Sequence, residues 1–530
     1  MTIRKKWLAL AVAAACTGNA WAGPNEERAK VEMLHETTLS LIQLLVEQGV
    51  LKQEVADAML KKAQQQAAEK MAQTQTAETA AEKGVVRVTY VPEHVKREIR
   101  DQVRQEVVAQ AKLERWGDVN AVPEWLDRLK WEGDIRVRYQ ADMFSERNAP
   151  EPFFQVIGQN ISNTLEDRHR ERLRLRLGLN ANVTSKVDAG VRITTGNTAD
   201  PVSTNQTLGN YDNKYSLVLD RAFLKLRPVN DLALWGGRIP NPFFSTDLIW
   251  DEDLNFEGVA VSYTPGTQDP QRAFKPFISA GAFPLQEIEG RLGVEARDKW
   301  LYAAQGGFEW APSTKSRFKV GAAYYEYRNV AGVLNPTPTT TGFYDLTAPQ
   351  FRQKGNSLFI IDSDANNNGN PGTEFDPVYG LAADFRIANL TMVADFAQFF
   401  PVHIIGSFDW ARNLGFDQSA IRTRTGQNIK PEIDAYQVKF TIGHPNFKYV
   451  DDNEWQAYIG YRYVERDAVL DAFTDSDFHL GGTNAKGFML GGSYALYKNT
   501  WLSARWMSSD EITGLPLSID VFQVDLNAKF

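Results

Sequence analysis

The sequence predicts an all-β transmembrane barrel of about 16 antiparallel strands, preceded by a helical N-terminal region with coiled-coil spacing. Three observations lead to this fold class. Apolar and polar side chains alternate from Trp131 onward, short and long connections alternate between these segments, and the chain ends on a strand whose last residue is Phe530. Unpaired backbone groups in lipid cost several kcal/mol each, so we expect this last strand to pair with the first and close the barrel.

The composition fits a barrel, although its average is that of a water-soluble protein. Hydrophobic residues make up 43% of the chain, the mean hydropathy is -0.37 and the formal net charge is -8. A barrel gives such values because only alternate residues face hydrocarbon. No later segment approaches the run of about 18 apolar residues that a transmembrane helix needs. The acidic balance argues against a nucleic-acid partner.

The N-terminus has the features of a secretory signal peptide, residues 1–22. Arg4, Lys5 and Lys6 precede the apolar run "WLALAVAAAC", and the small residues Ala20 and Ala22 precede the expected cleavage point. The only cysteine of the chain falls within this segment, so the mature protein would have no disulfide and no cysteine metal site. A lipoprotein signal at that cysteine is the alternative.

Residues 23–120 are expected to be helical and periplasmic. Five residues, Val31, Leu34, Thr38, Leu41 and Leu45, recur at alternating spacings of three and four, as in the seam of a coiled coil. Two heptads fit either an oligomerising coil, for example in a trimer, or a soluble helical hairpin. The barrel would then occupy residues 121–530.

Sixteen segments have the two-residue period of strands exposed to different media on their two faces. Their connections alternate between short turns and long loops, which is typical of outer-membrane barrels with periplasmic turns and external loops. The expected strands are 131–140, 168–183, 186–195, 217–228, 231–239, 256–264, 276–284, 299–310, 315–328, 378–396, 403–411, 432–443, 454–466, 486–497, 500–508 and 520–530.

Several long stretches resemble the putative porin family of Gram-negative bacteria. They are "YVPEHVKREIRDQVRQEV", "PEWLDRLKWEGDIRVRYQ", "LDRAFLKLRP" and "GGRIPNPFFSTDLIWDEDLNFEGVAVSY". The resemblance runs from about residue 85 to the end of the chain and implies an outer-membrane channel with a periplasmic N-terminal helical part. Phe530 also resembles the terminal aromatic residue by which the barrel assembly machinery recognises such proteins. The resemblance identifies no solute.

Basic side chains occupy the polar phase of the first five strands. Because Arg facing lipid at mid-bilayer costs about 2–4 kcal/mol, these residues are expected to line the lumen. They could pair with lumen acids and brace the wall, create a positive potential that favours anions, or do both. The expected basic wall comprises Arg136, Arg138, Arg170, Arg172, Arg174, Arg176, Arg192, Arg221, Lys225, Arg227 and Arg238.

The third long loop, "NPFFSTDLIWDEDLN", is acidic. It contains Asp247, Asp251, Glu252 and Asp253. By resemblance to general porins, we expect it to fold into the lumen opposite the basic wall and set a transverse field at a constriction, through which polar solutes would pass. A solvated loop at the rim of the barrel is the alternative.

Two further patterns concern ligands and catalysis. Asp362, Asp364, Asn366 and Asn368, in the longest loop, resemble part of a calcium loop, but the twelfth position holds Phe375 instead of the bidentate Glu. A flexible polar loop is therefore the alternative to calcium binding. The sequence has no zinc-binding H-E-x-x-H, no G-x-S-x-G and no phosphate-binding loop, so we expect no enzyme and no other cofactor.

The sequence therefore favours a porin in the outer membrane. It would form a water-filled channel through the lipid bilayer for passive diffusion of small polar solutes, including anions, and would associate with copies of itself. The alternative is an anchor, in which the barrel holds residues 23–120 against peptidoglycan or a periplasmic partner.

Overall fold

The computed structural model describes residues 128–530, apart from 268, 270–271, 291–296, 337–341, 364–376, 446 and 448–449. The expected signal peptide and the expected helical region at 23–120 lie outside the described residues and stay predictions. Within the described residues, no helix is long and apolar enough to cross a membrane.

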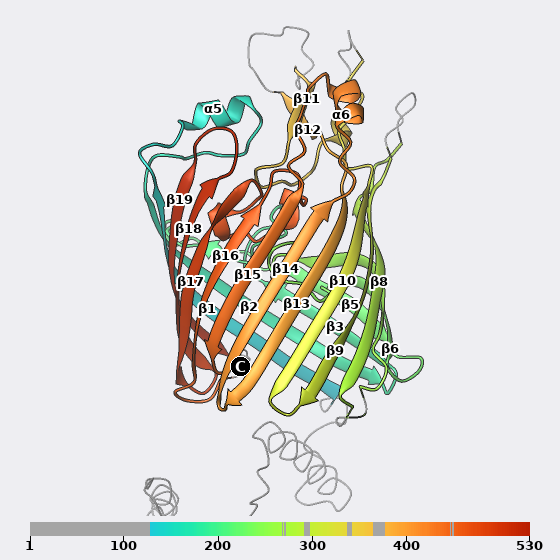
Figure 1. Cartoon of the computed structure of the whole chain (residues 1–530), viewed down its shortest axis with the longest axis vertical. Coiled ribbons are helices and arrows are strands. Elements are labelled where there is room, and N and C mark those ends of the chain that lie inside the picture. The colour runs from blue at the N-terminus through green and yellow to red at the C-terminus, as the bar shows by residue number, and fades with distance from the viewer. Residues whose placement is uncertain are drawn as a thin grey trace, which may run out of the picture. The chain divides into compact units, whose positions relative to one another are not determined.

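The described residues form a closed antiparallel barrel of sixteen strands, which confirms the fold class (Figure 1). Each strand pairs with its neighbours along the chain, and the last pairs with the first. The strands are β1 Leu129–Phe144, β2 Arg168–Thr184, β3 Val187–Thr194, β5 Val218–Leu226, β6 Leu232–Pro240, β7 Asn255–Tyr263, β8 Phe274–Gln286, β9 Lys299–Ser313, β10 Ser316–Arg328, β13 Arg386–Phe399, β14 Val402–Asn413, β15 Asp434–Gly443, β16 Trp455–Val464, β17 Ala485–Tyr497, β18 Thr500–Glu511 and β19 Ser518–Lys529.

The C-terminal residue completes the closure. β1 and β19 pair from Asp134 opposite Lys529 to Phe144 opposite Ile519. Beyond that ladder, the backbone of Gly133 donates to the carbonyl of Phe530 at 2.8 Å, and the Phe530 N–H donates back at 2.9 Å. Every strand therefore has a neighbour on both sides, and no sheet edge is left to be solvated by lipid.

Side chains alternate between the outer surface and the lumen as the sequence predicts. On β1, Val137 is 47% exposed on the outer surface, whereas its neighbour Arg138 is 2% exposed and points inward. On β19, Leu526 is 46% exposed and Asp525 is 8% exposed. An apolar exterior with a polar interior is the inverse of a soluble protein and suits a barrel in lipid.

The two ends of the barrel differ. Most connections at the lower end in Figure 1 are short turns, the longer ones being 264–273 and 444–454, and eight loops lie at the upper end. We number the loops along the chain: loop 1 (145–167), loop 2 (195–217), loop 3 (241–254), loop 4 (287–298), loop 5 (329–385), loop 6 (414–433), loop 7 (465–484) and loop 8 (512–517). Among their described residues, these loops contain α5 Glu151–Val156, β4 Gln206–Thr207, η3 Asp345–Thr347, β11 Leu358–Asp362, β12 Val378–Leu381, α6 Gln418–Thr425, η4 Asp471–Phe473 and η5 Phe478–Leu480.

One expected strand, 378–396, is two elements. β12 pairs with β11 in a hairpin above the barrel, and only β13, from Arg386, belongs to the barrel wall. Ala382, Ala383 and Phe385 between them are fully buried, and the Phe385 carbonyl accepts a hydrogen bond from the Tyr327 N–H. The apolar run looked continuous in sequence because residues buried under a loop and residues of a strand have the same composition.

An apolar core fills part of the lumen and fixes loop 3. Phe243 and Trp250 of loop 3 lie edge-on to Tyr325 of β10, with ring centroids 5.5 and 5.1 Å apart. Leu248 and Ile249 between them are 1% and 2% exposed. Burying these side chains stabilises the inward position by roughly 1.5–3 kcal/mol each, so loop 3 is held inside the barrel by its apolar residues.

The alternation gives a first testable prediction. Leu490 of β17 is 53% exposed on the outer surface, and Ser493 of the same strand lines the lumen. Leu490→Arg should lower the free energy of unfolding by about 2–4 kcal/mol because the charge faces lipid. Ser493→Arg is the matched control and should cost much less. Urea titration of tryptophan fluorescence in liposomes measures both, and equal losses would contradict the assigned faces.

Candidate functional site: the charged lumen

The ladder of arginines arises from the register of β1 and β2. Arg136 lies opposite Arg174, and Arg138 lies opposite Arg172. Because these residues are on the same face of two paired strands, their guanidinium groups crowd one wall of the lumen. The sequence predicted these positions from the alternation alone, and the structure brings them together.

Most of this wall is neutralised by carboxylates. Asp134 lies between Arg174 and Arg176, at 2.9 and 2.7 Å. The other ion pairs are Arg138 with Asp525 and Asp477, Arg170 with Asp142, Arg176 with Asp253, Arg192 with Asp220, and Arg227 with Asp188. These contacts correspond to the bracing interpretation.

Four expected wall residues have no carboxylate partner among the described residues. Arg136 donates to the Asn205 side chain, Arg172 to Gln140, and Arg221 to Asn255. The Lys225 ammonium lies 4.3 Å from the ring centroid of Trp235. Within the part of the chain that the structure describes, the Nε atoms of Arg136 and Arg172 are buried without a hydrogen-bond partner. The lumen therefore keeps positive charge that its own acids do not neutralise.

Arg238 departs from the expected wall. It pairs in register with Ala222 and Glu257 on the outer face of β6, and its guanidinium forms an ion pair with Glu257 at 2.5 Å. The phase of β6 is set by Trp235, whose ring packs against Phe223, at 5.4 Å, inside the barrel. Three residues further on, the side chain must face outward, so the sequence-based placement of Arg238 in the lumen was wrong.

Loop 3 places its four acids in different environments. Asp247 crosses to the far wall and pairs with Arg462 of β16 at 2.8 Å, whereas Asp253 pairs with Arg176 of the basic wall at 3.0 Å. Asp251 accepts hydrogen bonds from the N–H groups of Asp253 and Ser476. Glu252 is exposed toward the cavity. Loop 3 thus lies inside the barrel between two cationic walls.

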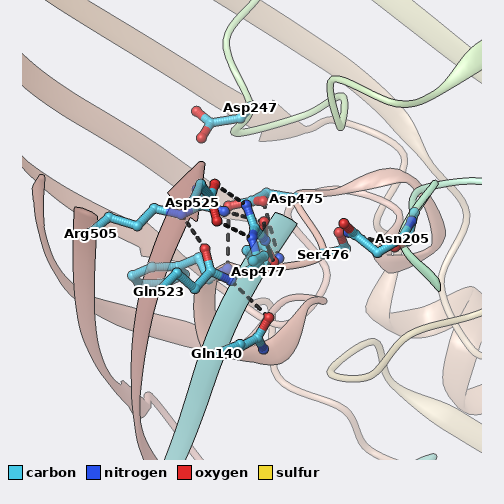
Figure 2. Close-up of polar contacts among 12 residues, drawn as sticks. Gln140, Asn205, Asp247, Asp475, Ser476, Asp477, Arg505, Gln523 and Asp525 are labelled. Carbon is cyan, nitrogen blue, oxygen red and sulfur yellow. Dashed lines mark hydrogen bonds and ion pairs between the residues drawn. The ribbon is translucent and has the colours of Figure 1, made fainter. Parts of the chain in front are cut away.

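Loop 7 also folds inward, which sequence reasoning missed. Asp477 accepts hydrogen bonds from Arg138, Arg505 and Gln523, and Figure 2 shows it beside the last two. Asp475 pairs with Arg462 at 3.0 Å. The signal was available in "DAFTDSDFHL", an acidic cluster comparable to loop 3. Arg462 and Arg505 were a second signal, because each is an isolated charged residue at a position of an apolar strand that faces the lumen.

The loop carboxyls respond differently to this environment. Although burial favours the neutral form, Arg462 and Lys439 hold the pKa of Asp247 below its usual range. Burial likewise opposes ionisation of Asp477, but Arg505 and Arg138 outweigh it and hold the pKa of Asp477 well below its usual range. Burial and the nearby Asp253 instead raise the pKa of Asp251. The acids that touch arginines stay charged, and the acid that joins the two loops favours its neutral form.

Loop 5 clamps loop 7 from the long-loop side. The Lys354 ammonium donates to the carbonyls of His479 and Gly481, and the Asn356 amide donates to those of Arg466 and Val469. Ser357 donates twice to the carboxylate of Asp467. Loop 7 is therefore held by loop 5, by loop 3 and by the arginines of the wall.

Three cavities follow one another along the lumen. The outer vestibule, about 320 Å³, lies among loops 1, 2, 5 and 7. The constriction, about 290 Å³, lies between the arginine wall and the acids of loops 3 and 7. The inner chamber, about 930 Å³, extends from loop 3 toward the short turns. Ser476 lines both the outer vestibule and the constriction, so the two are adjacent.

The calcium prediction is left largely untested. Asp362 ends β11 and accepts a hydrogen bond from the Asn335 amide at 2.8 Å, while Asp364, Asn366 and Asn368 lie outside the described residues. Among the residues that the structure does describe, no group of three or more His, Cys, Asp or Glu is arranged to hold a metal ion.

A closed barrel with an apolar exterior and a charged, cavity-containing lumen defines the class of outer-membrane channel proteins. The chain belongs to one family of that class: the family model described as "Putative porin" matches residues 35–530. A porin role in the outer membrane follows from this membership. A search of curated proteins finds no match.

Solved outer-membrane proteins resemble the chain at low identity. OmpT of Vibrio cholerae, in a mutant lacking loop L8, is 12% identical over 76% of this chain and 100% of that chain, with a TM-score of 0.39. The channel DcaP of Acinetobacter baumannii is 11% identical over 76% and 97%, with a TM-score of 0.39. OprB of Pseudomonas putida, at high pH, is 12% identical over 77% and 96%, with a TM-score of 0.42.

The buried arginine of β16 gives a second prediction. Arg462 is 3% exposed and neutralises Asp247 and Asp475. Arg462→Met should destabilise the protein by about 3–5 kcal/mol, because it leaves the buried Asp475 and the half-buried Asp247 without their cation. Arg412→Met is the matched control, since Arg412 pairs with Asp434 at 3.4 Å on the surface. Losing this exposed ion pair should lower the free energy of unfolding by less than about 1 kcal/mol. Urea unfolding in liposomes compares them; similar losses would show that Arg462 does not anchor the loops.

The buried acids of loop 7 give a third prediction. Burial raises the pKa of Asp467 to about 6 and that of Asp471 to about 7. Between about pH 4 and 7 the folded state therefore binds more protons than the unfolded state, so the packing of loop 7 should weaken as pH rises through this range. Amide hydrogen exchange of residues 467–484, corrected for intrinsic rates, should be faster at about pH 7 than at about pH 5.

Asp471→Asn should make that pH dependence shallower, because the amide stays neutral throughout. Asp510→Asn, on an exposed side chain, is the control and should leave the dependence unchanged. Exchange that does not vary with pH in the unmodified protein would contradict the role of these two carboxyls.

Proposed function

We propose that this porin is a passive diffusion channel for small polar solutes whose outer vestibule attracts anions. The observation that carries the proposal is the set of lumen guanidinium groups that no carboxylate of the described residues neutralises, above all Arg172 in the outer vestibule and Arg136 in the constriction. A guanidinium keeps its charge at any working pH and presents donors suited to carboxylates and phosphates.

The charged residues that line each cavity indicate where anions would be attracted. The outer vestibule is lined by four arginines, Arg168, Arg170, Arg172 and Arg352, and by two carboxylates, Asp142 and Asp200. Lys354 also lines it, but burial lowers its pKa to about 7 and its donors serve loop 7. Asp142 already pairs with Arg170. In the constriction, acids of loops 3 and 7 face the arginines instead. The vestibule would therefore concentrate anions, and the constriction would orient dipolar solutes across its field.

The position of loops 3 and 7 supports a size limit. Both lie inside the barrel and are held by ion pairs to opposite walls, through Asp247 and Asp475 on Arg462 and through Asp253 on Arg176. A polar lumen of this kind passes hydrated solutes and slows bulky apolar ones, which would lose hydration without gaining contacts. Passage requires no enzymatic step, and we propose none.

Other parts of the proposal concern surroundings that the described residues do not include. The short turns and residues 23–120 would face the periplasm, copies of the chain would associate, for example as trimers, and Phe530 would be read by the barrel assembly machinery. Calcium at loop 5 remains part of the proposal. The anchor function would depend on residues 23–120, and nothing in the described residues favours it.

Reversal potentials in planar bilayers test the proposal. In a salt gradient, the protein should give ohmic steps with anion preference. The double variant Arg136→Ala, Arg172→Ala should lower the anion-to-cation permeability ratio by about twofold or more, because both unneutralised charges are lost. Arg317→Ala is the control, since Arg317 is an exposed residue that pairs with Glu309.

Cation preference in the unmodified protein would overturn the anion part of the proposal, as would a permeability ratio that the double variant leaves unchanged. A silent barrel without conductance would overturn the diffusion channel itself and favour the anchor.

A further inference from the structure

We propose that a side chamber next to the outer vestibule is a binding site for a carboxylate solute with an apolar, ring-sized body, and that Lys299 holds the carboxylate. The chamber has a volume of about 710 Å³ and lies among loops 2, 3, 5 and 7 and the ends of β7, β8 and β9. Cavities of about 300–1,000 Å³ with apolar walls and a few polar groups are typical of small-molecule sites.

Apolar side chains make up most of the chamber wall. Trp250 and Leu254 come from loop 3, and Leu381 and Phe473 from loops 5 and 7. Phe283 of β8 and Leu301 of β9, each 1% exposed, complete the surface. Such a wall would gain roughly 25 cal/mol for each Å² of apolar solute surface that it covers, so it suits a hydrocarbon body.

Lys299 is the polar group that points to an anion. It begins β9 in the same phase as the buried Leu301 and is 4% exposed. Its ammonium donates to the carbonyl of Ala348 at 2.5 Å and makes no ion pair with a carboxylate of the described residues. An ammonium has three donors, and a buried charge without a counter-ion is costly, so an anion in the chamber would complete the contacts of Lys299.

Three of the four acids that line the chamber form ion pairs with arginines, and the fourth, Asp200, accepts a hydrogen bond from the backbone N–H of Val202. Asp253 bonds Arg176 and Thr204, and Asp220 bonds Arg192 and Asn255. Glu257 pairs with Arg238 at 2.5 Å. These carboxylates therefore do not neutralise Lys299, and the anion of a solute could take that place.

Gln286 lies beside the ammonium but offers no contact for a carboxylate. It lies opposite Lys299 in the register of β8 and β9, and its Oε1 atom is buried without a hydrogen-bond partner among the described residues. An amide oxygen only accepts hydrogen bonds, so the carboxylate would be held by the Lys299 ammonium. One cation without a carboxylate partner among the described residues, in a largely apolar chamber, matches one carboxylate on an apolar body.

The chamber adjoins the proposed entry path. Asp200, Ser203 and Phe351 line both the chamber and the outer vestibule. An amphipathic carboxylate drawn into the vestibule would meet the chamber before it reaches the constriction. The inference rests on the proposed diffusion channel for this access alone, and equilibrium binding tests it independently of conductance.

The test is equilibrium dialysis of the full chain in detergent against naphthoate, its neutral analogue naphthylmethanol, and acetate. Naphthoate should bind more tightly than naphthylmethanol, and acetate, which lacks the apolar body, should not compete. Lys299→Gln should weaken naphthoate binding by about tenfold, since it removes a charge-assisted hydrogen bond, and leave naphthylmethanol nearly unchanged. Circular dichroism and heat-modified mobility show whether each variant is folded.

Two further variants separate the causes. Val330→Trp adds volume at the chamber wall, where Val330 is 4% exposed, and should weaken both naphthalene ligands while Lys299 is intact. Lys315→Gln, on the exposed turn between β9 and β10, should change neither. Equal binding of the acid and the alcohol, or full naphthoate affinity in folded Lys299→Gln, would overturn the proposal. Conductance would reveal a failure of the channel itself separately.

Discussion

The backbone hydrogen bonds that close the cylinder between β1 and β19 are the constraint on which the rest of the structure depends. A sheet in lipid cannot end at an open edge, because no water is present to solvate its N–H and C=O groups. Once Phe530 exchanges hydrogen bonds with Gly133, each strand has a fixed phase. That phase sends Val137 to lipid and Arg138 to the lumen. The charged interior is thus a consequence of closure and of the alternation.

Closure creates an electrostatic problem that the loops resolve. Arginines from neighbouring strands stand opposite one another in register, as Arg138 and Arg172 do. Carboxylates from the far end of the chain meet them: Asp477 of loop 7 bonds Arg138 and Arg505. The same contacts that neutralise the wall hold the loops inside the barrel and narrow the lumen. Bracing and selectivity are therefore two results of one set of ion pairs.

Sequence reasoning succeeded where local period decides the outcome. The sixteen strands and the inward direction of Arg136 follow from a two-residue repeat with lipid on one side. It failed where distant segments decide. Arg238 faces outward because the packing of Trp235 on Phe223 sets the phase of β6. The role of loop 7 was missed because Asp477 meets its partners only across the lumen.

The sequence by itself determined the class of fold, the number of strands and which residues could be wet, because hydrocarbon and water impose opposite demands on adjacent side chains. Only the tertiary structure decided which charges are neutralised. Arg174 pairs with Asp134, whereas Arg136 donates to the amide of Asn205 and meets no carboxylate among residues that the structure describes, although both occupy the same phase of paired strands. The physical reason is that an ion pair requires proximity in space. In a barrel, residues hundreds of positions apart become neighbours only after the wall has closed.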